Sequence, residues 1–384
     1  MSAPAITFLI RSLDVGGAER QLVELATGLH RSAWRVKVIT FYPNGPLEER
    51  LKTAGVPIVC LNKRGRWDIA CLRRLAQDLR RDAPDIVHGY LPLPNILLVL
   101  LRPTLRTHVV WGVRASNMDL DRYDWLAKIE FALARILSRF ADLIICNSEA
   151  GRAYHLARGF RSDRAIVIPN GIDLTRFKPD ESARKQLRAE WGIDGNRPLV
   201  GIVARLDVMK DHSNFLRAAA LVLQARPDTR FVCVGGGIPE YRDKLRRLNS
   251  SLGLDGCVMW ADLRTDVWRV YNALDVAVLS SAFGEGFPNV VAEAMATGVP
   301  CVVTDVGDAA AVVGDRGWVC PPGDSASLAR AMIDALNALP CDAAALRNRV
   351  HSHYSTEALL ERTAARLFEL LGNARSSTRA VAAR

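Results

Sequence analysis

The chain has 384 residues, 49% of them hydrophobic and 24% charged, which is an ordinary composition for a soluble globular protein. Its length favours two domains over one, and no apolar run reaches the ~18 residues of a membrane-spanning helix. Nine of the ten net positive charges arise in residues 1–180, which hold 27 Lys and Arg against 18 Asp and Glu. This excess favours an anionic partner such as a membrane surface, a lipid diphosphate or a nucleic acid.

The first part of the chain alternates short apolar runs with helical patterns. Amphipathic helices are predicted at residues 19–29, 69–81 and 125–140. The alternation predicts an α/β domain with a doubly wound parallel sheet, which binds ligands at the carboxyl ends of its strands. The predicted strands are residues 6–10, 36–41, 57–61, 85–88, 109–113, 143–146 and 165–168.

The first strand leads into a turn that contains Gly16 and Gly17, directly before a helix. Two adjacent glycines allow a ligand to approach the backbone closely at a helix N-terminus. The turn lacks the G-x-G-x-x-G spacing of a dinucleotide-binding fingerprint. A purely geometric role for the glycines stays open, as does a solvated first helical turn for Glu19 and Arg20.

Two polar residues stand where neighbouring strands are predicted to end. His88 ends the strand at 85–88, and Arg114 directly follows the strand at 109–113. Because an arginine cannot act as a base at neutral pH, Arg114 would bind a phosphate, a carboxylate or sugar hydroxyls. The alternative for His88 is a hydrogen-bonded histidine near the sheet edge.

A D-x-D motif, Asp119 and Asp121, follows in the next loop. Such a motif can hold a divalent cation when it ends an apolar strand. Here it stands in a polar loop, so an acidic helix start is the better interpretation and no metal site is predicted.

The helix at 125–140 is amphipathic, with apolar residues set against Lys128, Arg135 and Arg139. The pattern favours a helix that packs on the sheet over one that contacts a membrane. One part of its surface can pack on the sheet while another part contacts a membrane.

Pro169, Asn170 and Gly171 indicate a loop, and they predict a linker near residues 169–182. The alternation then starts again, which predicts a second parallel α/β domain. Residues 341–372 are helical in pattern. The strands predicted here are residues 199–204, 230–234, 258–261, 276–279, 301–304 and 318–320.

Two cations follow the first strand of the second domain, Arg205 and, five residues later, Lys210. At the mouth of a ligand site they would offset charge that develops on a departing phosphate, and a solvated pair of charges is the alternative. Gly235 begins a run of three glycines that can bring the backbone close to a ligand. Leu263 and Arg264 follow the strand after that.

The strand at 276–279 leads through a glycine loop to a helix that begins with Pro288 and Asn289. An exposed helix N-terminus attracts phosphate through its free N–H groups and the helix dipole. Glu285 lies in the loop, and Glu293 lies in the second turn of the helix, where it can accept hydrogen bonds from two sugar hydroxyls. The alternative is a surface loop with two solvated glutamates.

The spacing of Glu285 and Glu293 resembles the Glu, seven residues, Glu signature of retaining glycosyltransferases with the two-domain GT-B fold. The surrounding residues resemble family 4 (glycosyl transferases group 1). The G-G-A-E-R turn at 16–20 and the I-P-N-G-I-D segment at 168–173 resemble its diphosphate loop and its interdomain crossing. The chain departs from the family at Arg114, where many relatives have a histidine that contacts the donor sugar.

The resemblance implies an α/β fold of two Rossmann-like doubly wound parallel-sheet domains that face each other across a cleft. Residues 1–172 would form the acceptor-binding domain, and residues 173–350 would form the nucleotide-sugar-binding domain. Residues 351–372 would form a helix that crosses back to the first domain, and residues 373–384 a disordered tail.

The resemblance also implies roles for the residues above. Arg205 and Lys210 would bind the donor phosphates, Glu293 the ribose, and Glu285 hydroxyls of the donor sugar. The implied catalytic set is Glu285, Arg205, Lys210, Arg114 and His88. The implied donor-binding set is Gly16, Gly17, Arg205, Lys210, Gly235, Leu263, Arg264, Glu285, Gly286, Phe287, Pro288, Asn289 and Glu293.

The implied reaction moves a sugar from a nucleotide-sugar donor, UDP- or GDP-linked, to an acceptor hydroxyl with retention of anomeric configuration. The family's usual mechanism is a same-face displacement that needs neither a metal nor another cofactor. The basic first domain favours a lipid-linked saccharide of surface polysaccharide assembly as the acceptor, with peripheral contact to an anionic membrane.

Other functions remain as alternatives. A nucleotide-sugar epimerase or a phosphorylase can use the same scaffold, although no lysine is recognisable as a Schiff-base partner for pyridoxal phosphate. A nucleic-acid-binding protein is disfavoured, because the basic residues are scattered and form no recognition motif. Without a C-x-x-C pair among eight cysteines or a signal-peptide pattern, we expect a cytoplasmic protein, associated with the inner membrane face where its acceptor is lipid-linked.

Overall fold

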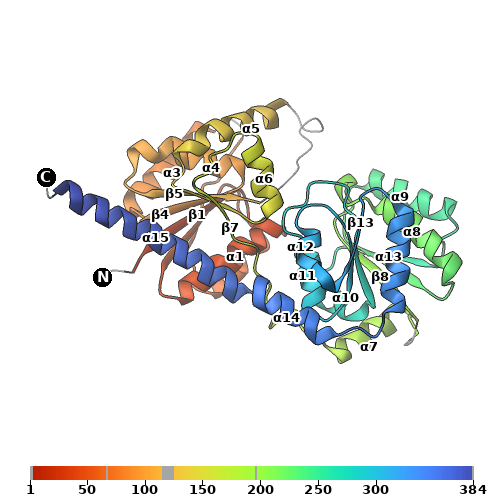
Figure 1. The fold of residues 1–384 in the computed structure, drawn as a ribbon. Coiled ribbons are helices and arrows are strands. Elements are labelled where there is room, and N and C mark those ends of the chain that lie inside the picture. The colour runs from red at the N-terminus through yellow and green to blue at the C-terminus, as the bar shows by residue number, and fades with distance from the viewer. Residues whose placement is uncertain (1–2, 66–67, 115–124, 195–196, 383–384) are drawn as a thin grey trace. The chain divides into compact units, whose positions relative to one another are not determined.

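The protein, seen here as a computed structural model, is described over residues 3–65, 68–114, 125–194 and 197–382 (Figure 1). The chain divides into two compact units. The first contains residues 1–171 together with 356–384, and the second contains residues 172–355. The chain therefore passes between the units twice, at Gly171–Ile172 and at Ser355–Thr356.

The first unit is built on a seven-stranded parallel sheet with the order β3-β2-β1-β4-β5-β6-β7. The strand order reverses between β1 and β4, and loops that leave such a switch point form the ligand-binding crevice of doubly wound domains. The strands are β1 (Ala5–Ile10), β2 (Arg35–Thr40), β3 (Ile58–Cys60), β4 (Ile86–Tyr90), β5 (His108–Val113), β6 (Leu143–Cys146) and β7 (Ala165–Val167).

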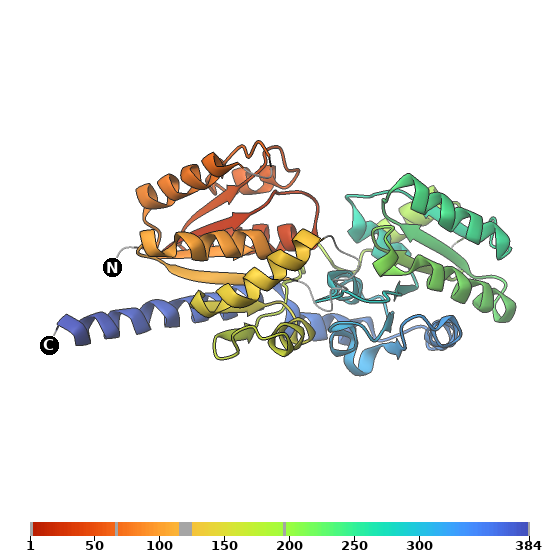
Figure 2. The same ribbon diagram turned by 90° about the horizontal axis from the view of Figure 1, so that it is seen from above.

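Helices cover both faces of this sheet, with α1 and α15 on one face and α3, α4 and α5 on the other (Figure 2). Because both faces are covered, the central strands are continuous apolar runs, and every residue of β1 is buried. The helices are α1 (Gly17–Arg31), α2 (Glu48–Thr53), α3 (Ile69–Asp82), α4 (Pro92–Leu101), α5 (Trp125–Leu137), α6 (Glu149–Ala157) and α15 (Thr356–Ala382), with 3-10 turns η1 (Arg102–Thr104) and η3 (Ser138–Phe140).

The predicted end of a strand at His88 is wrong, because β4 continues to Tyr90. Gly89 and Tyr90 stay in register with β5, and the ring of Tyr90 packs edge-on against Phe8 of β1. His88 therefore lies in the middle of the sheet, opposite Phe8 and Val110.

The core of the first unit is completed by α15, which comes from the far end of the chain. Leu359 and Leu367 are buried against α1, where Gly28 leaves room for Leu360: a Cβ at Gly28 would lie 2.3 Å from Leu360 Cδ2. The helix expected at 351–372 is divided at Ser355, because α14 ends at Tyr354 and α15 begins at Thr356. The assignment of residues 373–384 to a disordered tail stays a prediction.

The second unit has a six-stranded parallel sheet with the order β10-β9-β8-β11-β12-β13, and its switch point lies between β8 and β11. The strands are β8 (Leu199–Val203), β9 (Arg230–Val234), β10 (Val258–Ala261), β11 (Val276–Leu279), β12 (Cys301–Thr304) and β13 (Trp318–Cys320). Two parallel sheets of this kind confirm the predicted pair of Rossmann-like doubly wound domains.

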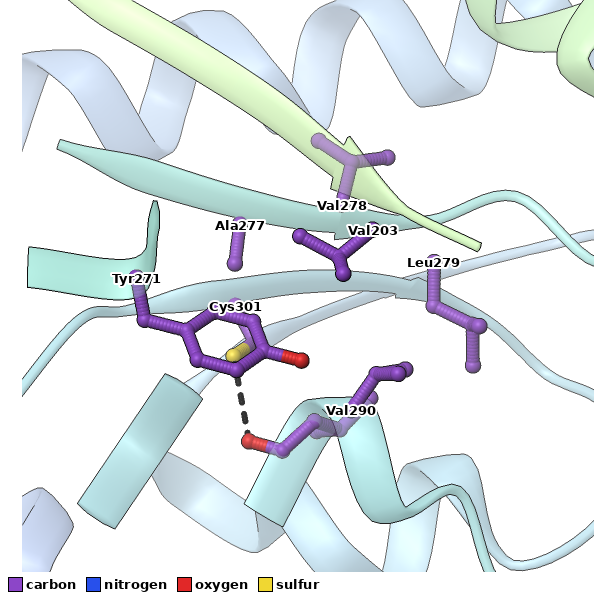
Figure 3. Close-up of a pocket in the computed structure, with 8 residues that line it drawn as sticks. Val203, Tyr271, Ala277, Val278, Leu279, Val290 and Cys301 are labelled. Atoms are coloured by element: carbon purple, nitrogen blue, oxygen red, sulfur yellow. Dashed lines mark hydrogen bonds between the residues drawn. The ribbon is translucent and has the colours of Figure 1, made fainter. Parts of the chain in front are cut away.

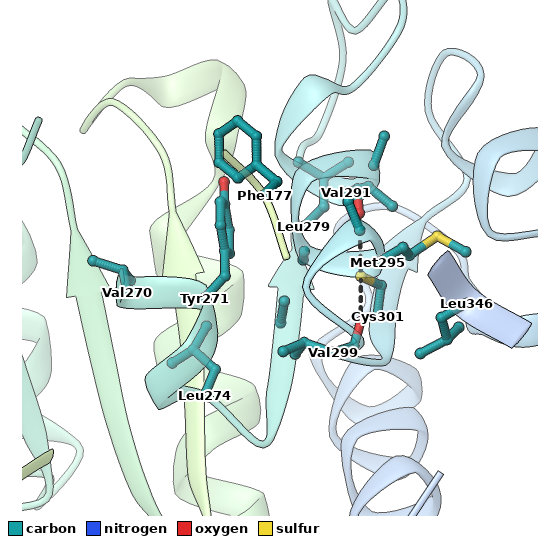
Figure 4. Close-up of a cluster of buried hydrophobic side chains, with 14 of the residues drawn as sticks. Phe177, Val270, Tyr271, Leu274, Leu279, Val291, Met295, Val299, Cys301 and Leu346 are labelled. Carbon is teal, nitrogen blue, oxygen red and sulfur yellow. Dashed lines mark hydrogen bonds between the residues drawn. The ribbon is translucent and has the colours of Figure 1, made fainter. Parts of the chain in front are cut away.

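One face of the second sheet is covered by α8 and α13, and the other by α10, α11 and α14. Figure 4 shows the second of these layers, in which Tyr271 and Phe177 pack beside Val291 and Met295 of α11. The helices are α7 (Glu181–Glu190), α8 (His212–Ala225), α9 (Pro239–Ser251), α10 (Val267–Ala273), α11 (Asn289–Ala296), α12 (Ala309–Val313), α13 (Ser325–Asn337) and α14 (Ala343–Tyr354), with 3-10 turns η4 (Val208–Lys210) and η5 (Gly314–Arg316).

The first crossing begins at a residue that is fixed by a side chain. Gln21 of α1 donates from Nε2 to the Gly171 carbonyl oxygen at 2.8 Å, and its Oε1 accepts from the Gly171 N–H at 2.8 Å. Both hydrogen bonds are buried, so the first unit holds the chain up to its last residue before the crossing. On the other side, Ile172 forms a single bridge with Ser355.

Candidate active site

The loops that leave the switch point of the second unit bring Lys210 and Glu285 into contact. Lys210 donates from Nζ to Oε1 of Glu285, and the Ser281 hydroxyl donates to the same oxygen at 2.5 Å. The Glu285 side chain is 8% exposed and that of Lys210 is 17% exposed. A carboxylate this buried requires partners that compensate its charge, and Lys210 and Ser281 provide them.

The two loops are held together by their backbones. The Ala282 N–H donates to the Met209 carbonyl at 2.8 Å, and the Ser280 hydroxyl donates to the Lys210 carbonyl at 2.8 Å. Gly284 has a φ of +79°, which a glycine adopts without strain, and a Cβ there would lie 2.4 Å from the Met209 sulfur. The glycine of this loop is therefore required by close packing, and that packing fixes the position of Lys210.

The N-terminus of α11 follows directly after Glu285. Its N-cap is Pro288, which makes no capping hydrogen bond with its side chain. The first amides of a helix that lacks a side-chain cap, together with the helix dipole, favour an anion at this end. Phe287 is buried and packs edge-on against Tyr354, so the start of α11 is fixed to α14.

Glu293 is also buried, with 4% of the residue exposed. The Tyr271 hydroxyl donates to its Oε2 at 2.9 Å and orients the carboxylate. The space between Tyr271, the sheet and α11 is a cavity of about 10 Å³ with an apolar lining that includes Val203, Leu279 and Cys301 (Figure 3). Its apolar lining offers a water too few polar partners, so it is a packing void and not a ligand site.

Arg205 lies in the same loop as Lys210 but in a different environment. Its side chain is 69% exposed and forms an ion pair with Asp207, with 3.0 Å between Nη2 and Oδ2. Asp207 also caps the 3-10 turn η4 by accepting from the Met209 N–H at 2.9 Å. The β8 loop thus carries one fixed cation and one exposed cation.

Gly235 stands at the carboxyl end of β9 for a reason of packing. It has a φ of +151°, and a Cβ would lie 2.0 Å from the Ala204 carbonyl oxygen. The Leu206 N–H donates to the Gly236 carbonyl at 2.8 Å, which joins the β9 loop to the loop of Arg205. The glycine run therefore allows two loops to contact each other, and a donor-binding role for Gly235 stays a prediction.

Leu263 and Arg264 follow β10, and their side chains differ. Leu263 is 69% exposed. The Arg264 guanidinium donates twice to Asp266 at 2.8 Å and once to Glu190 at 3.1 Å. The hydrogen bonds to Asp266, and then the one to Glu190, raise the pKa of Arg264. Since the guanidinium is held by two carboxylates, Leu263 and the backbone are the groups of this segment that a ligand can contact.

In the first unit, Gly16 and Gly17 lie where β1 passes into α1. Gly16 is the N-cap and Gly17 the first residue of the helix, without a side-chain cap. The Glu19 carboxylate folds back over Gly16, so that a Cβ there would lie 2.0 Å from Glu19 Oε2. Burial raises the pKa of this carboxyl group.

Arg114 follows β5 and lies on the ring of Tyr90, with 4.3 Å from the guanidinium carbon to the ring centroid. Its Nη1 donates to Oδ1 of Asn170 at 3.3 Å. His88 is fully buried, 4.9 Å from the Tyr90 ring between centroids. Burial, and then the charge of Arg114, lowers the His88 pKa well below its ordinary value, so its imidazole is neutral.

The structure thus assembles two groups of predicted residues, each within one unit. Lys210, Glu285 and the start of α11 come together in the second unit, and Arg114 and His88 adjoin through Tyr90 in the first. Ser281, Tyr271 and Asn170, which orient these residues, were missed, because no motif or spacing in the sequence indicates them. Asp119 and Asp121 lie outside the described residues, and the described part of the chain contains no cluster of residues that could hold a metal ion.

His212 begins α8, two residues after Lys210, and is fully buried. Neither of its ring nitrogens has a hydrogen-bond partner within the described residues. Burial, followed by the nearby charge of Lys210, lowers its pKa to about 4. Its imidazole is therefore neutral at pH 7 and packs as a buried, uncharged side chain at the start of α8.

We expect the free energy of unfolding to fall as the pH decreases below about 6.5, the ordinary histidine pKa. In this range the unfolded chain takes up a proton at residue 212 and the folded protein does not, so His212 lowers stability by about 1.4 kcal/mol per pH unit until its folded pKa is reached, in addition to the effect of buried His88. Urea unfolding between about pH 7 and pH 5 measures this slope. His212→Gln should reduce it, and the exposed His351→Gln should leave it unchanged; equal slopes in all three proteins would contradict the assignment.

Comparisons with known proteins agree with this architecture. Residues 15–176 match the model of Glycosyltransferase Family 4, and residues 197–338 match that of Glycosyl transferases group 1. A GDP-mannose-dependent alpha-(1-6)-phosphatidylinositol monomannoside mannosyltransferase from Mycolicibacterium smegmatis is 33% identical over 296 residues, which cover 74% of this chain and 76% of the relative.

An Escherichia coli UDP-Gal:alpha-D-GlcNAc-diphosphoundecaprenol alpha-1,3-galactosyltransferase is 27% identical over 272 residues, 68% of each chain. The crystal structure of Anabaena Alr3699/HepE in complex with UDP shares the fold, with a TM-score of 0.84, 23% identity and coverage of 95% of this chain and 100% of that one.

These matches, together with the two doubly wound domains, show a glycosyltransferase that uses a nucleotide sugar. The chain belongs to glycosyltransferase family 4, group 1. None of the helices in the described residues has the length and apolar content to cross a bilayer.

Proposed function

We propose that this enzyme is a retaining, metal-independent hexosyltransferase that moves a sugar from a UDP-sugar to a hydroxyl group of a lipid-linked saccharide in cell-surface polysaccharide biosynthesis. The observation that carries the proposal is the Lys210–Glu285 ion pair beside the uncapped N-terminus of α11. It combines a cation and a helix dipole for a diphosphate with a carboxylate for sugar hydroxyls.

The donor diphosphate would lie against Lys210, Arg205 and the first amides of α11. Two cations and a helix N-terminus stabilise the negative charge that develops on a departing nucleoside diphosphate. They can do so without a divalent cation, which is the basis for proposing metal independence. Glu293, oriented by Tyr271, would accept hydrogen bonds from the two ribose hydroxyls.

Glu285 would hold hydroxyls of the donor sugar and so fix the face on which the reaction takes place. The bond between the anomeric carbon and the phosphate oxygen breaks, and a bond from that carbon to the acceptor oxygen forms on the same face. The acceptor proton moves to the departing phosphate. The Glu285 carboxylate is held by Lys210 and Ser281, which favours this route over a covalent glycosyl-enzyme.

The first unit would hold the acceptor, with Arg114 as the group that binds it. Its guanidinium is fixed by Tyr90 and Asn170, so it can bind a phosphate, a carboxylate or sugar hydroxyls without much loss of side-chain entropy. His88, buried beneath Tyr90, would support this arrangement. A lipid-linked saccharide is supported by the basic first half of the chain and by the diphosphoundecaprenol acceptor in the name of the Escherichia coli relative.

The donor can be identified by ligand-induced stabilisation. We expect UDP and a UDP-sugar to raise the thermal unfolding temperature more than GDP, ADP or their sugar conjugates do, with no change on adding EDTA. At one hundred times its dissociation constant a ligand stabilises the fold by about 2.7 kcal/mol, which is readily measured.

Each alternative result has a definite meaning. A response to GDP alone would make the enzyme a GDP-sugar transferase, as in the name of the mycobacterial relative. A response that EDTA abolishes would contradict metal independence, and no response to any nucleotide would contradict the proposed donor site.

A further inference from the structure

The helix α5 exposes far more apolar surface than the other helices. Four large hydrophobic side chains of α5, and Phe140 in η3 directly after it, are exposed by 45% or more, and no other helix of the described residues has more than two. They are Trp125 (66%), Ile129 (46%), Leu133 (45%), Ile136 (45%) and Phe140 (48%). Contiguous apolar surface of this kind usually marks an interaction site.

These side chains form one continuous stripe. Successive residues of an α-helix are rotated by about 100°, so Trp125, Ile129, Leu133 and Ile136, together with exposed Ala132, occupy an arc of about 100°. Exposed Lys128 and Arg135 lie along one flank of that arc, and Arg139 and Phe140 follow in η3. Glu130, the one acidic residue between Trp125 and Phe140, is half-buried beyond the other edge of the arc, about 60° from Leu133. We call these nine exposed residues the α5 surface.

The buried side of α5 is already occupied. Ala134 is buried, and Phe131 and Leu137 pack on the core cluster that also contains α3 and α4. Phe131 contacts Phe160 at 5.3 Å and Tyr154 at 6.1 Å between ring centroids. The helix therefore has its own core contacts, and the α5 surface is additional to them.

We propose that the α5 surface docks the enzyme on an anionic lipid bilayer, with α5 lying in the plane of the interface. An apolar arc with exposed Arg135 and Arg139 beside it matches acyl chains beneath anionic headgroups, and tryptophan favours the boundary between the two. The location of the charge agrees, since the excess of basic residues lies in the first half of the chain.

The charges on this surface argue against a second copy of the chain as the occupant. In a symmetric dimer the same patch would meet itself, and Arg135 and Arg139 of the two copies would be brought together at an apolar interface. The docking surface deepens the proposed function, because a lipid-linked acceptor is presented at such a surface.

Vesicle flotation tests the docking of the whole protein. We expect binding to vesicles of equimolar phosphatidylcholine and phosphatidylglycerol and much weaker binding to phosphatidylcholine alone. Ile129→Gln combined with Leu133→Gln should lower the partition coefficient by at least about tenfold, since both side chains lose their burial in the acyl region. Arg135→Gln combined with Arg139→Gln should lower it by about fivefold per charge.

Matched controls replace exposed residues of the same types on other helices. Ile69→Gln with Leu221→Gln, and Arg73→Gln with Arg80→Gln on α3, should bind like the unchanged protein. Failure of the unchanged protein to float, equal binding to the two vesicle types, or equal binding by the α5 and control variants would each overturn the proposal. So would loss of a dimer, measured by light scattering, in the α5 variants alone, because the surface would then be a contact between copies.

The α5 variants should retain the full UDP-induced rise in unfolding temperature, which separates this inference from the proposed function. A protein that floats with anionic vesicles and ignores every nucleotide would keep the docking surface and lose the transferase proposal. A protein that responds to UDP and does not float with anionic vesicles would lose the docking surface and keep the transferase proposal.

Discussion

Replacing Lys210 with alanine should lower kcat/KM for sugar transfer by about 10²–10³-fold, the loss expected when a preorganised charge-stabilising group is removed. Lys210 is the fixed cation of the proposed diphosphate site, held by Glu285 and by the backbone contacts of the β8 and β11 loops. Its loss also leaves Glu285 buried without a counter-charge. Steady-state kinetics with a UDP-sugar measures the change, and UDP affinity should fall as well.

A matched control exists on α7, where Lys185 pairs with Glu181 at 3.7 Å and both side chains are more than two-thirds exposed. An ion pair at the surface contributes little, so Lys185→Ala should change neither kcat/KM nor UDP affinity by more than about twofold. Equal activity of Lys210→Ala and Lys185→Ala would contradict the role of Lys210.

Glu285→Gln should weaken contacts to the donor sugar without weakening contacts to the donor phosphates. Glutamine keeps the size of the side chain and can still accept the hydrogen bond from Ser281, but it binds sugar hydroxyls without charge assistance. We expect transfer to fall by about 10- to 100-fold, the cost of one charge-assisted hydrogen bond. Binding of UDP, which has no sugar, should be retained or strengthened, because Lys210 no longer shares its charge with a carboxylate.

The two variants at the ion pair therefore have different signatures. Lys210→Ala weakens both UDP binding and transfer, whereas Glu285→Gln weakens transfer alone. Isothermal titration with UDP and with an intact UDP-sugar distinguishes them, and Glu181→Gln is the surface control. Parallel losses of UDP affinity in both variants would show that Glu285 serves only to hold Lys210.

Much of the fold could be predicted from the sequence, because parallel sheets covered on both faces require apolar runs that are visible without a structure. The strand at 276–279 matches β11, and the helix expected after Pro288 is α11. The candidate site could be located for a related reason. Its cations and carboxylates follow strand ends, which meet at one edge of a parallel sheet.

The contacts that orient those residues could not be predicted. Tyr271 reaches Glu293 from a different helix, and Asn170 reaches Arg114 across 56 residues, so neither contact has a spacing to detect. The position of His88 was missed because the strand continues through a glycine, and Gly89 suggests a turn in a sequence. Arg264 was assigned to the donor, and the pairing with Asp266 and Glu190 appears only when the chain is folded.

The last helix of the chain, α15, packs in the first unit, and this affects the order in which the chain can fold. Residues 172–355 form one continuous segment with its own cores, so the second unit can fold as soon as this segment has been synthesised. The first unit is made earlier but lacks Leu359 and Leu367, which close the layer over α1. During translation the part of α1 that α15 covers therefore stays exposed until the last helix leaves the ribosome. The half of the chain that is made first is thus the last to complete its core, and exposed apolar surface of that kind is what chaperones bind.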